Sequence, residues 1–173
     1  MQLGDGDLSA LGRLFDVSAS RLLRYAQTIT RSREDAEDAL QAAMICVAKN
    51  PKRLALAQHP WAYFLRVVRN ETLKIVGRRQ PMHSLNSALQ VWTPEPDQTE
   101  CNERCDLVRV ALKRLPTEQA EVVALKIWEE MTFLEIAIVL GESANTAASR
   151  YRYALAKLSR YLQPIADEVC HDF

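Results

Sequence analysis

Apolar residues recur three and four positions apart over most of this chain, which is the period of an amphipathic helix. The alternation of apolar and polar residues that marks a half-buried strand is absent. A helix with one apolar stripe has to bury that stripe against another element, so the expected fold class is all-α. The pattern predicts helices over residues 8–29, 33–49, 61–76, 120–128, 133–140 and 144–162.

The helical pattern stops in the middle of the chain and later resumes. The interruption holds three prolines and several Ser, Asn and Gln residues, a composition typical of a linker. We therefore expect two small helical domains, residues 1–79 and 101–163, joined by a flexible linker over residues 80–100. An acidic tail over residues 164–173 follows the second domain.

The composition fits a folded protein with uneven charge. Hydrophobic side chains make up 48% of the 173 residues, and 22 Lys and Arg balance 22 Asp and Glu. Residues 1–80 hold 13 Lys and Arg against 8 Asp and Glu, whereas residues 81–107 hold 1 against 5. This excludes a uniformly basic nucleic-acid-binding coat, but not a local one. No apolar run approaches the roughly 20 residues of a membrane span, and no signal peptide is visible, so we expect no membrane insertion and a cytoplasmic location.

Two capping patterns divide the second half of the chain into a short helix and a long one. Thr132 and Glu135 form a capping box before the helix over 133–140, and Gly141 follows at a position that favours a left-handed residue. Ser143 then caps the following helix. A short helix, a turn of about three residues and a second helix predict a helix-turn-helix.

Opposite faces of this predicted unit have different roles. The inward faces are expected to be Ile136, Ala137 and Leu140 on the first helix, and Ala147, Tyr151, Leu155 and Leu158 on the second. The outward face of the second helix begins with mostly hydrogen-bonding side chains that suit base edges and phosphates. These candidate DNA contacts are Ser143, Asn145, Thr146, Ala148, Ser149, Arg150 and Arg152. The spacing alone also fits an ordinary helical hairpin with a solvated polar face.

The helix predicted over residues 61–76 and the residues just after it carry a mostly cationic stripe that can follow a phosphate backbone. Its members are Arg66, Arg69, Asn70, Lys74, Arg78 and Arg79. Trp61 at the start of the helix could stack on an unpaired base, although an aromatic residue in an amphipathic helix is more often part of the core. A solvated surface is the alternative for the charged stripe.

No residue pattern points to catalysis or to a bound cofactor. Cys46 lies in an apolar helical run and is expected in the core, while Cys101 and Cys105 lack a further ligand at zinc spacing. The three histidines are scattered, and no nucleophile has a neighbouring base. We expect no metal, no organic cofactor and no enzymatic activity.

Several short segments occur in a characteristic order along the chain. The first half has Asp-Ala-Glu-Asp-Ala-Leu-Gln at 35–41 and Trp-Ala-Tyr-Phe-Leu-Arg-Val-Val-Arg-Asn at 61–70. The second half has Leu-Pro-Thr-Glu-Gln at 115–119, Phe-Leu-Glu-Ile-Ala at 133–137 and Asn-Thr-Ala-Ala-Ser-Arg-Tyr-Arg-Tyr-Ala-Leu at 145–155. Over about residues 8–160 the chain thus resembles the extracytoplasmic-function (ECF) sigma factors of the sigma-70 family. In that family these segments belong, in order, to a helix that docks on the polymerase clamp, a helix that engages the −10 promoter element and a domain that binds the −35 element.

The resemblance implies an RNA polymerase sigma factor that directs promoter recognition and transcription initiation. It assigns Asp35, Asp38 and Gln41 to polymerase binding, the stripe with Trp61 to the −10 element and the face over 143–152 to the −35 element. The implied partners are the β′ clamp and β flap of core RNA polymerase, promoter DNA and an anti-sigma protein, with the active factor monomeric. The acids among residues 34–38 would also stabilise their helix N-terminus.

The predicted linker is long enough for both domains to bind one promoter. Residues 80–99 reach roughly 65 Å when extended at about 3.3 Å per residue. Promoter elements ~20 base pairs apart are separated by a similar length, because each base-pair step rises about 3.4 Å.

Two other hypotheses stay open. A free-standing helix-turn-helix regulator would bind palindromic DNA as a dimer, without polymerase. A sigma-like decoy or adaptor would bind polymerase or a regulator without starting transcription. The decoy hypothesis is motivated by Ala42 and Ala148, which stand where members of the family often have an acid and a lysine.

Overall fold

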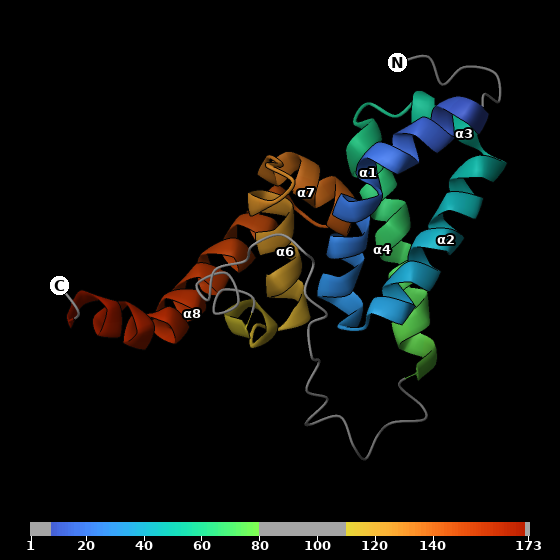
Figure 1. Ribbon diagram of the computed structural model, residues 1–173. Helices are drawn as coiled ribbons and strands as arrows, with labels where there is room; N and C mark the ends of the chain where they lie inside the picture. Colours follow the sequence, from blue (N-terminus) through green and yellow to red (C-terminus); the bar gives the residue numbers. More distant parts are fainter. Residues whose placement is uncertain (1–7, 80–109, 172–173) are drawn as a thin grey trace.

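The computed structural model describes residues 8–79 and 110–171. All regular secondary structure in these residues is helical (Figure 1). The helices are α1 (Leu8–Thr30), α2 (Arg33–Lys49), α3 (Pro51–Ala55), α4 (Pro60–Arg79), α6 (Thr117–Ile127), α7 (Phe133–Leu140) and α8 (Ala144–His171). The all-α fold class is confirmed. None of the described helices is long and apolar enough to cross a membrane. The expected linker, with Cys101 and Cys105, lies outside the described residues.

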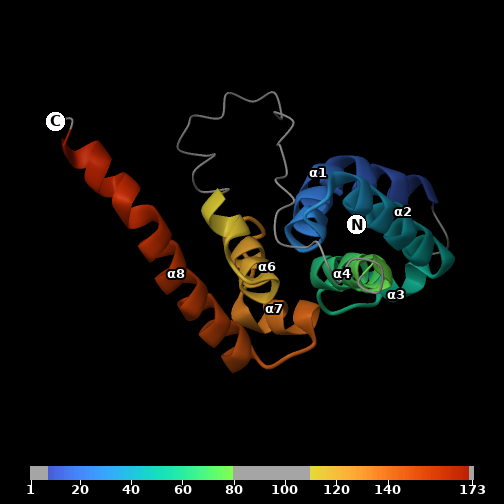
Figure 2. The same ribbon diagram turned by 90° about the horizontal axis from the view of Figure 1, so that it is seen from below.

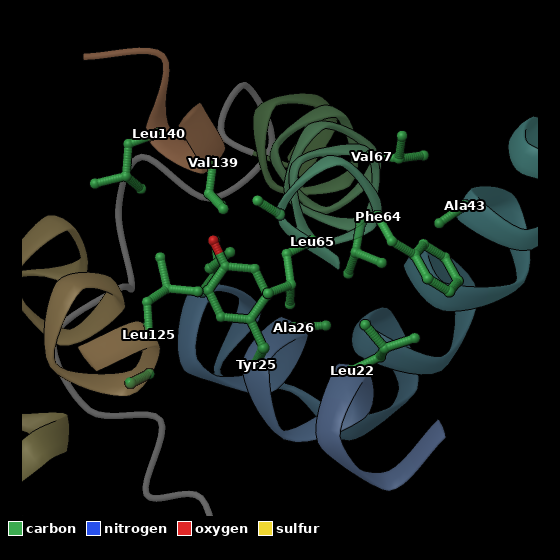
Figure 3. Close-up of a cluster of buried hydrophobic side chains, with 14 of the residues drawn as sticks. Leu22, Tyr25, Ala26, Ala43, Phe64, Leu65, Val67, Leu125, Val139 and Leu140 are labelled. Carbon is green, nitrogen blue, oxygen red and sulfur yellow. The ribbon is translucent and has the colours of Figure 1, made fainter. Parts of the chain in front are cut away.

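In the N-terminal half, α1, α2 and α4 pack together and bury their apolar stripes against one another (Figures 1 and 2). Leu22 and Tyr25 of α1, Ala43 of α2, and Phe64 and Leu65 of α4 are at most 1% exposed and belong to one cluster (Figure 3). Burial of apolar surface at about 25 cal/mol per Å² is the main term that holds these helices together. The expected packing of three amphipathic helices is confirmed.

Three helix boundaries differ from those that the periodicity predicts. Helix α4 continues past Gly77, which has an ordinary helical backbone instead of the left-handed one of a C-cap. Helix α8 continues beyond Leu162 to His171, since residues 165–171 contain no glycine or further proline to end it. The segment between the helices predicted over 33–49 and 61–76 begins with a short helix, α3. Pro51 starts it, because the missing amide hydrogen of proline is harmless in a first turn.

Capping side chains and a left-handed glycine set several helix ends, and the predicted capping box and the predicted Gly141 turn are confirmed. The Ser32 side chain accepts from the Asp35 amide at the start of α2, and Thr132 and Glu135 form a complete capping box at the start of α7. Gly141 closes α7 in the left-handed conformation, with φ 72°. Each cap pairs a backbone group that the helix itself leaves free.

Two apolar side chains expected inside are exposed. Cys46 lies on the solvent side of α2, where its neighbour Val47 takes the buried position. Leu155 of α8 is 42% exposed, and its neighbour Ala154 packs on the buried side instead. Each error concerns a single residue beside a buried neighbour. Elsewhere on the predicted inward face of α8, Ala147 and Leu158 are buried as expected. Among the described residues, no group of three or more His, Cys, Asp or Glu could hold a metal ion.

The two halves of the chain pack against each other through a shared core. Helix α7 lies on α4, and α6 lies on α1 (Figures 1 and 2). Leu125 of α6 and Val139 and Leu140 of α7 belong to the same buried cluster as Tyr25 and Leu65 (Figure 3). We call the contact of α6 and α7 with α1 and α4 the seam. It places the helix-turn-helix beside the helix that carries the cationic stripe.

Candidate nucleic-acid interface

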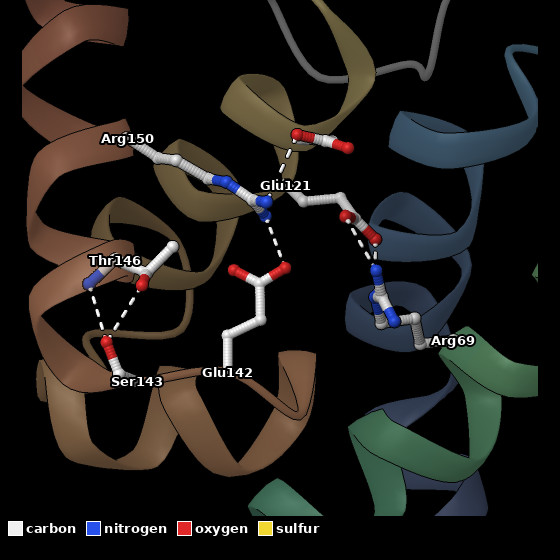
Figure 4. A network of polar contacts seen from close by, with 7 residues as sticks. Arg69, Glu121, Glu142, Ser143, Thr146 and Arg150 are labelled. Carbon is white, nitrogen blue, oxygen red and sulfur yellow. Dashed lines mark hydrogen bonds and ion pairs between the residues drawn. The ribbon is translucent and has the colours of Figure 1, made fainter.

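The turn between α7 and α8 is fixed by hydrogen bonds at both of its ends. The Gly141 amide donates to the Ala137 carbonyl at 2.8 Å, and the Thr146 amide donates to the Ser143 hydroxyl at 3.0 Å (Figure 4). The Ser143 and Thr146 hydroxyl oxygens are 2.8 Å apart. Both hydroxyls therefore lie at the N-terminal end of α8, the end that enters the major groove in helix-turn-helix proteins.

The solvent side of the first turns of α8 carries most of the predicted −35 contacts. Asn145, Thr146 and Arg152 are exposed, whereas Ala148 and Ser149 are half-buried. Arg152 donates from Nη2 to the Ser149 hydroxyl at 3.3 Å, which keeps its guanidinium along the helix surface. An amide, hydroxyls and a guanidinium at one exposed helix end can donate to base acceptors and phosphates.

Arg150, another predicted −35 contact, is held by carboxylates. Its guanidinium pairs with Glu142 at 2.9 Å and with Glu118 at 3.2 Å, and its side chain is 22% exposed (Figure 4). The two ion pairs join α8 to the turn before it and to α6. A DNA contact by Arg150 stays a prediction, since its guanidinium already has two carboxylate partners.

On α4, most positions of the predicted −10 stripe face solvent. The exposed members are Arg66, Asn70, Lys74 and Arg78. Spacings of four residues place them along one side of the helix, where a phosphate backbone can follow them. Lys74 is paired with Glu71 at 2.6 Å, and Arg79 is the last residue of α4.

Arg69 belongs to the same predicted stripe but is turned into the seam. Its Nε donates to Glu121 Oε1 at 2.9 Å, and its Nη2 donates to Glu121 Oε2 at 3.4 Å (Figure 4). The side chains of Arg69 and Glu121 are 16% and 2% exposed. This buried pair joins the two halves, and removal of one partner would leave the other charge unpaired in apolar surroundings.

Trp61 is also held by a carboxylate of the C-terminal half. Its indole Nε1 donates to Glu129 Oε2 at 2.9 Å, and the same oxygen accepts from Arg21 Nη2 at 2.7 Å. The Arg21 guanidinium lies 4.8 Å from the centre of the indole ring, and Phe64 packs on the ring in a T-shaped arrangement. The ring is half-buried at the seam, so a stacking role on DNA stays a prediction.

Burial and ion pairing oppose each other in the electrostatics of the seam. Burial alone would lower the pKa of Arg69, yet the charge of Glu121 raises that pKa above its ordinary value. The Glu121 carboxyl shows the opposite balance. Burial raises the pKa of this carboxyl above its ordinary value, and the Arg69 guanidinium offsets only part of that effect. Burial also raises the pKa of Tyr25 well above its ordinary value, and the negative charge of Glu121 adds to the rise. The Tyr25 hydroxyl is buried and has no hydrogen-bond partner among the described residues. The closed seam therefore holds polar groups that water would solvate better.

The residues predicted to bind polymerase lie on α2. Asp38 and Gln41 are exposed, whereas Asp35 is 5% exposed at the capped start of the helix. Gln41 lines an open groove of about 300 Å³ between α1 and α2. The apolar side chains of Phe15 and Leu23 form part of its wall. An apolar groove beside polar side chains can receive a helix of a partner protein.

Sequence reasoning missed Glu121 and Glu129 as candidate functional residues. Both are buried in the C-terminal half, and both bind side chains of the predicted −10 surface. Glu121 stands in Ala-Glu-Val-Val-Ala-Leu, so an acid inside an apolar run was the available signal. That signal could not identify Arg69 as the partner, because the two residues are 52 positions apart.

Comparison with known families assigns both halves of the chain. The family described as Sigma-70 region 2 matches residues 14–81, and the family described as Sigma-70, region 4 matches residues 105–158. A helical fold that pairs a cationic helix with an exposed helix-turn-helix thus defines a DNA-binding transcription initiation factor.

Characterised relatives agree over most of the chain. It is 33% identical over 159 residues to the ECF RNA polymerase sigma factor SigM of Mycobacterium tuberculosis, covering 91% of this chain and 79% of that protein. It is 32% identical over 141 residues to the RNA polymerase sigma-E factor of Streptomyces coelicolor, covering 82% and 79%. The chain therefore belongs to the ECF sigma factors of the sigma-70 family, which direct transcription initiation.

Two solved structures have a similar fold. The sigma factor RpoE, solved in complex with the anti-sigma factor NepR from Bartonella quintana, gives a TM-score of 0.75 at 18% identity. That match covers 88% of this chain and 96% of the other. CnrH, solved in complex with the cytosolic domain of CnrY, gives a TM-score of 0.64 at 24% identity and covers 94% of each chain.

Proposed function

We propose that this sigma factor binds core RNA polymerase through α2 and reads a bipartite promoter through α4 and the start of α8. Residues 1–79 and 101–163 act as separate domains in this state, with residues 80–100 as the connection. The observation that carries the proposal is the capped N-terminus of α8. It presents Asn145, Thr146 and Arg152 to solvent on a helix-turn-helix.

The start of α8 is assigned to the −35 element. Asn145 and Arg152 suit base edges, because an amide can pair with adenine and a guanidinium with guanine. The hydroxyls of Ser143 and Thr146 lie at the positive end of the helix dipole, where a phosphate is favoured. The half-buried Ala148 and Ser149 let the helix approach the groove closely.

The stripe on α4 is assigned to the −10 element. The side chains of Arg66, Asn70, Lys74 and Arg78 are exposed and can follow the phosphates of a separated strand. Two further predicted contacts, Trp61 and Arg69, complete this surface when the seam opens. Arg79, at the end of α4, is also assigned to it.

The exposed face of α2 is assigned to the polymerase clamp and the C-terminal half to the β flap. Asp38 contributes negative charge and Gln41 hydrogen bonds, and charge complementarity gives orientation and speed to the encounter. Asp35 supports the surface from the capped helix start. The polymerase supplies the chemistry, so the chain itself needs no cofactor.

Regulation by an anti-sigma protein is part of the proposal. One of the two similar solved structures is a sigma factor in complex with an anti-sigma factor, and the other is CnrH in complex with the cytosolic domain of CnrY. We expect this chain to act in the cytoplasm, as a monomer within the polymerase complex. An anti-sigma protein would have to release it before it binds core enzyme.

Run-off transcription with purified core polymerase and genomic fragments tests this function. The expected result is a discrete start site preceded by an asymmetric pair of elements. Asp38→Asn should weaken core binding, while Asp16→Asn, an exposed acid on α1, serves as the charge-matched control. Core binding without a transcript would favour the decoy hypothesis. Binding only to palindromic DNA, as a dimer, would favour the free-standing regulator.

A further inference from the structure

Arg69 occupies a position that suits two alternative partners. It lies on α4 among the side chains assigned to the −10 element, yet its guanidinium is bound by Glu121 of the C-terminal half at 2.9 and 3.4 Å (Figure 4). A carboxylate offers a guanidinium two acceptor oxygens, as a phosphate does. Glu121 therefore occupies donors with which Arg69 would bind DNA.

The seam also keeps the two DNA-binding surfaces next to each other. Helix α7 packs on α4, and Arg66 Nη2 lies 3.9 Å from the position that a Cβ atom on Gly141 would take. Promoter elements ~20 base pairs apart are separated by roughly 65 Å, because each step rises about 3.4 Å. One chain can occupy both elements only after α7 has left α4.

We propose that Glu121 is an internal competitor of DNA phosphate for Arg69, and that the Arg69–Glu121 pair holds the free chain in a closed, self-blocked form. Only one part of this inference rests on the proposed function, namely that DNA phosphate is the alternative partner of Arg69. The closed form itself is independent of that assignment, and the two parts are tested separately.

Opposing contributions to the free energy determine whether the chain is closed or open. Apolar contacts of Leu125 and Val139 across the seam favour closure, because opening would return their surfaces to water. Desolvation of Glu121 and the unpaired Tyr25 hydroxyl favour opening, since water would satisfy both groups. Because the pair carries this desolvation cost, a partner that binds the open form can release it.

The Arg69–Glu121 pair is the best point at which to disturb this balance. Glu129 also crosses the seam to Arg21, but that arginine is 47% exposed, so water already solvates one partner of this ion pair. Arg31 donates across the seam to the Leu115 carbonyl at 2.9 Å, a contact without a carboxylate. Neutralising Glu121 leaves these contacts intact but places an uncompensated Arg69 charge in the closed seam.

The test uses the full chain with Glu121→Gln and measures its radius of gyration by small-angle X-ray scattering. We expect a larger radius than that of the wild-type chain. Glu118→Gln is the matched control, because Glu118 lies one turn earlier on α6, is exposed, and pairs with Arg150 inside the C-terminal half. It should keep the wild-type radius. An unchanged radius for Glu121→Gln would overturn the closed-form lock.

A second measurement follows binding to a random-sequence single-stranded DNA as the salt concentration is varied. Glu121→Gln should bind about tenfold more tightly, and the slope of log K against log salt should steepen by at least ~0.7, the value for one phosphate contact. Arg69→Ala combined with Glu121→Gln removes both the uncompensated charge and the phosphate contact, so this double variant should return toward the wild-type radius and lose the gain in affinity. An expanded chain without tighter DNA binding would overturn the competition with phosphate while leaving the lock in place.

If Glu121→Gln loses its helical circular dichroism signal, the charge-swapped double variant R69E/E121R provides the test instead. If the two side chains hold the seam by pairing, this double variant should recover the compact radius relative to each single reversal. A double variant as expanded or as unfolded as the single reversals would overturn the proposal.

Discussion

The start of α8 and the stripe on α4 are both assigned to DNA, yet different contacts hold them. On α8, the contacts that shape the surface are local: Ser143 caps the helix at Thr146, and Arg152 bonds to Ser149. On α4, two of the assigned side chains, Arg69 and Trp61, are bound by carboxylates of the other half. A locally built surface is ready in any arrangement of the halves, whereas under the proposed assignment the α4 surface is complete only when the seam opens.

Removal of a large side chain from the shared core should have the largest effect, because this core supports α4 and its DNA-binding surface. Phe64 is fully buried on α4, and Phe64→Ala should lower the free energy of unfolding by about 3–5 kcal/mol, because it loses apolar burial and leaves a cavity. Urea denaturation followed by circular dichroism measures the change. Leu56→Ala is the control, since Leu56 is 84% exposed and its loss should change stability by less than about 0.5 kcal/mol. Equal effects at the two sites would mean that the core does not hold α4.

Loss of one reading side chain should affect the local surface alone. Arg152→Ala should weaken binding of the polymerase complex to its −35 element by about 1–3 kcal/mol if the guanidinium contacts a base. Arg160→Ala removes the same charge two turns further along α8, also from an exposed position, and should have a smaller effect. Fluorescence anisotropy with promoter and mismatched duplexes measures both variants. An Arg152→Ala effect that vanishes in the Glu121→Gln background would show that the α8 surface also depends on the seam.

The same division between local and distant contacts explains what the sequence could predict. The capping box, Gly141 and the helix-turn-helix follow from residues within one turn of each other, and the structure confirms them. The predicted C-terminal ends of α4 and α8 were wrong. Gly77 follows the predicted end of α4, and the acidic tail follows that of α8, but neither feature forces a helix to stop. The pairing of Arg69 with Glu121 was out of reach, because periodicity gives the face of a helix but not the helix opposite.

Substitution of two glycines tests whether the turn before α8 needs a left-handed residue. Gly141 has φ 72°, so Gly141→Ala should lower stability by about 1–2 kcal/mol through backbone strain. Crowding adds little: apart from the neighbours of Gly141 in the chain, the new methyl group meets only Arg66 Nη2, at 3.9 Å, among the described residues. Gly77→Ala lies within α4 with open space around it and should instead raise stability by roughly 0.5–1 kcal/mol. Thermal unfolding of both variants gives the sign, and two changes of the same sign would contradict the αL turn.

The smallest expected effect concerns the cap that starts α7. The Thr132 hydroxyl and amide donate to Glu135 Oε2 at 2.7 and 2.8 Å, and the Glu135 amide donates back to the Thr132 hydroxyl at 3.3 Å. These bonds from Thr132 lower the pKa of Glu135 below its ordinary value of 4.5. Thr132→Ala should therefore reduce stability at pH 7 by about 1 kcal/mol, the usual contribution of a cap.

The sign of the pH dependence follows from the lowered pKa. A carboxyl that is more acidic in the folded chain stabilises it above pH 4.5, and this contribution is lost as pH falls toward the folded pKa. The stability difference between wild type and Thr132→Ala should therefore shrink at pH 3, where only the bond from the Glu135 amide keeps part of the cap. Thr28→Ala removes a hydroxyl that donates to the Arg24 carbonyl, so its effect should not change with pH. Urea titrations at both pH values decide the matter, and a Thr132→Ala difference that is constant with pH would remove Glu135 from the cap.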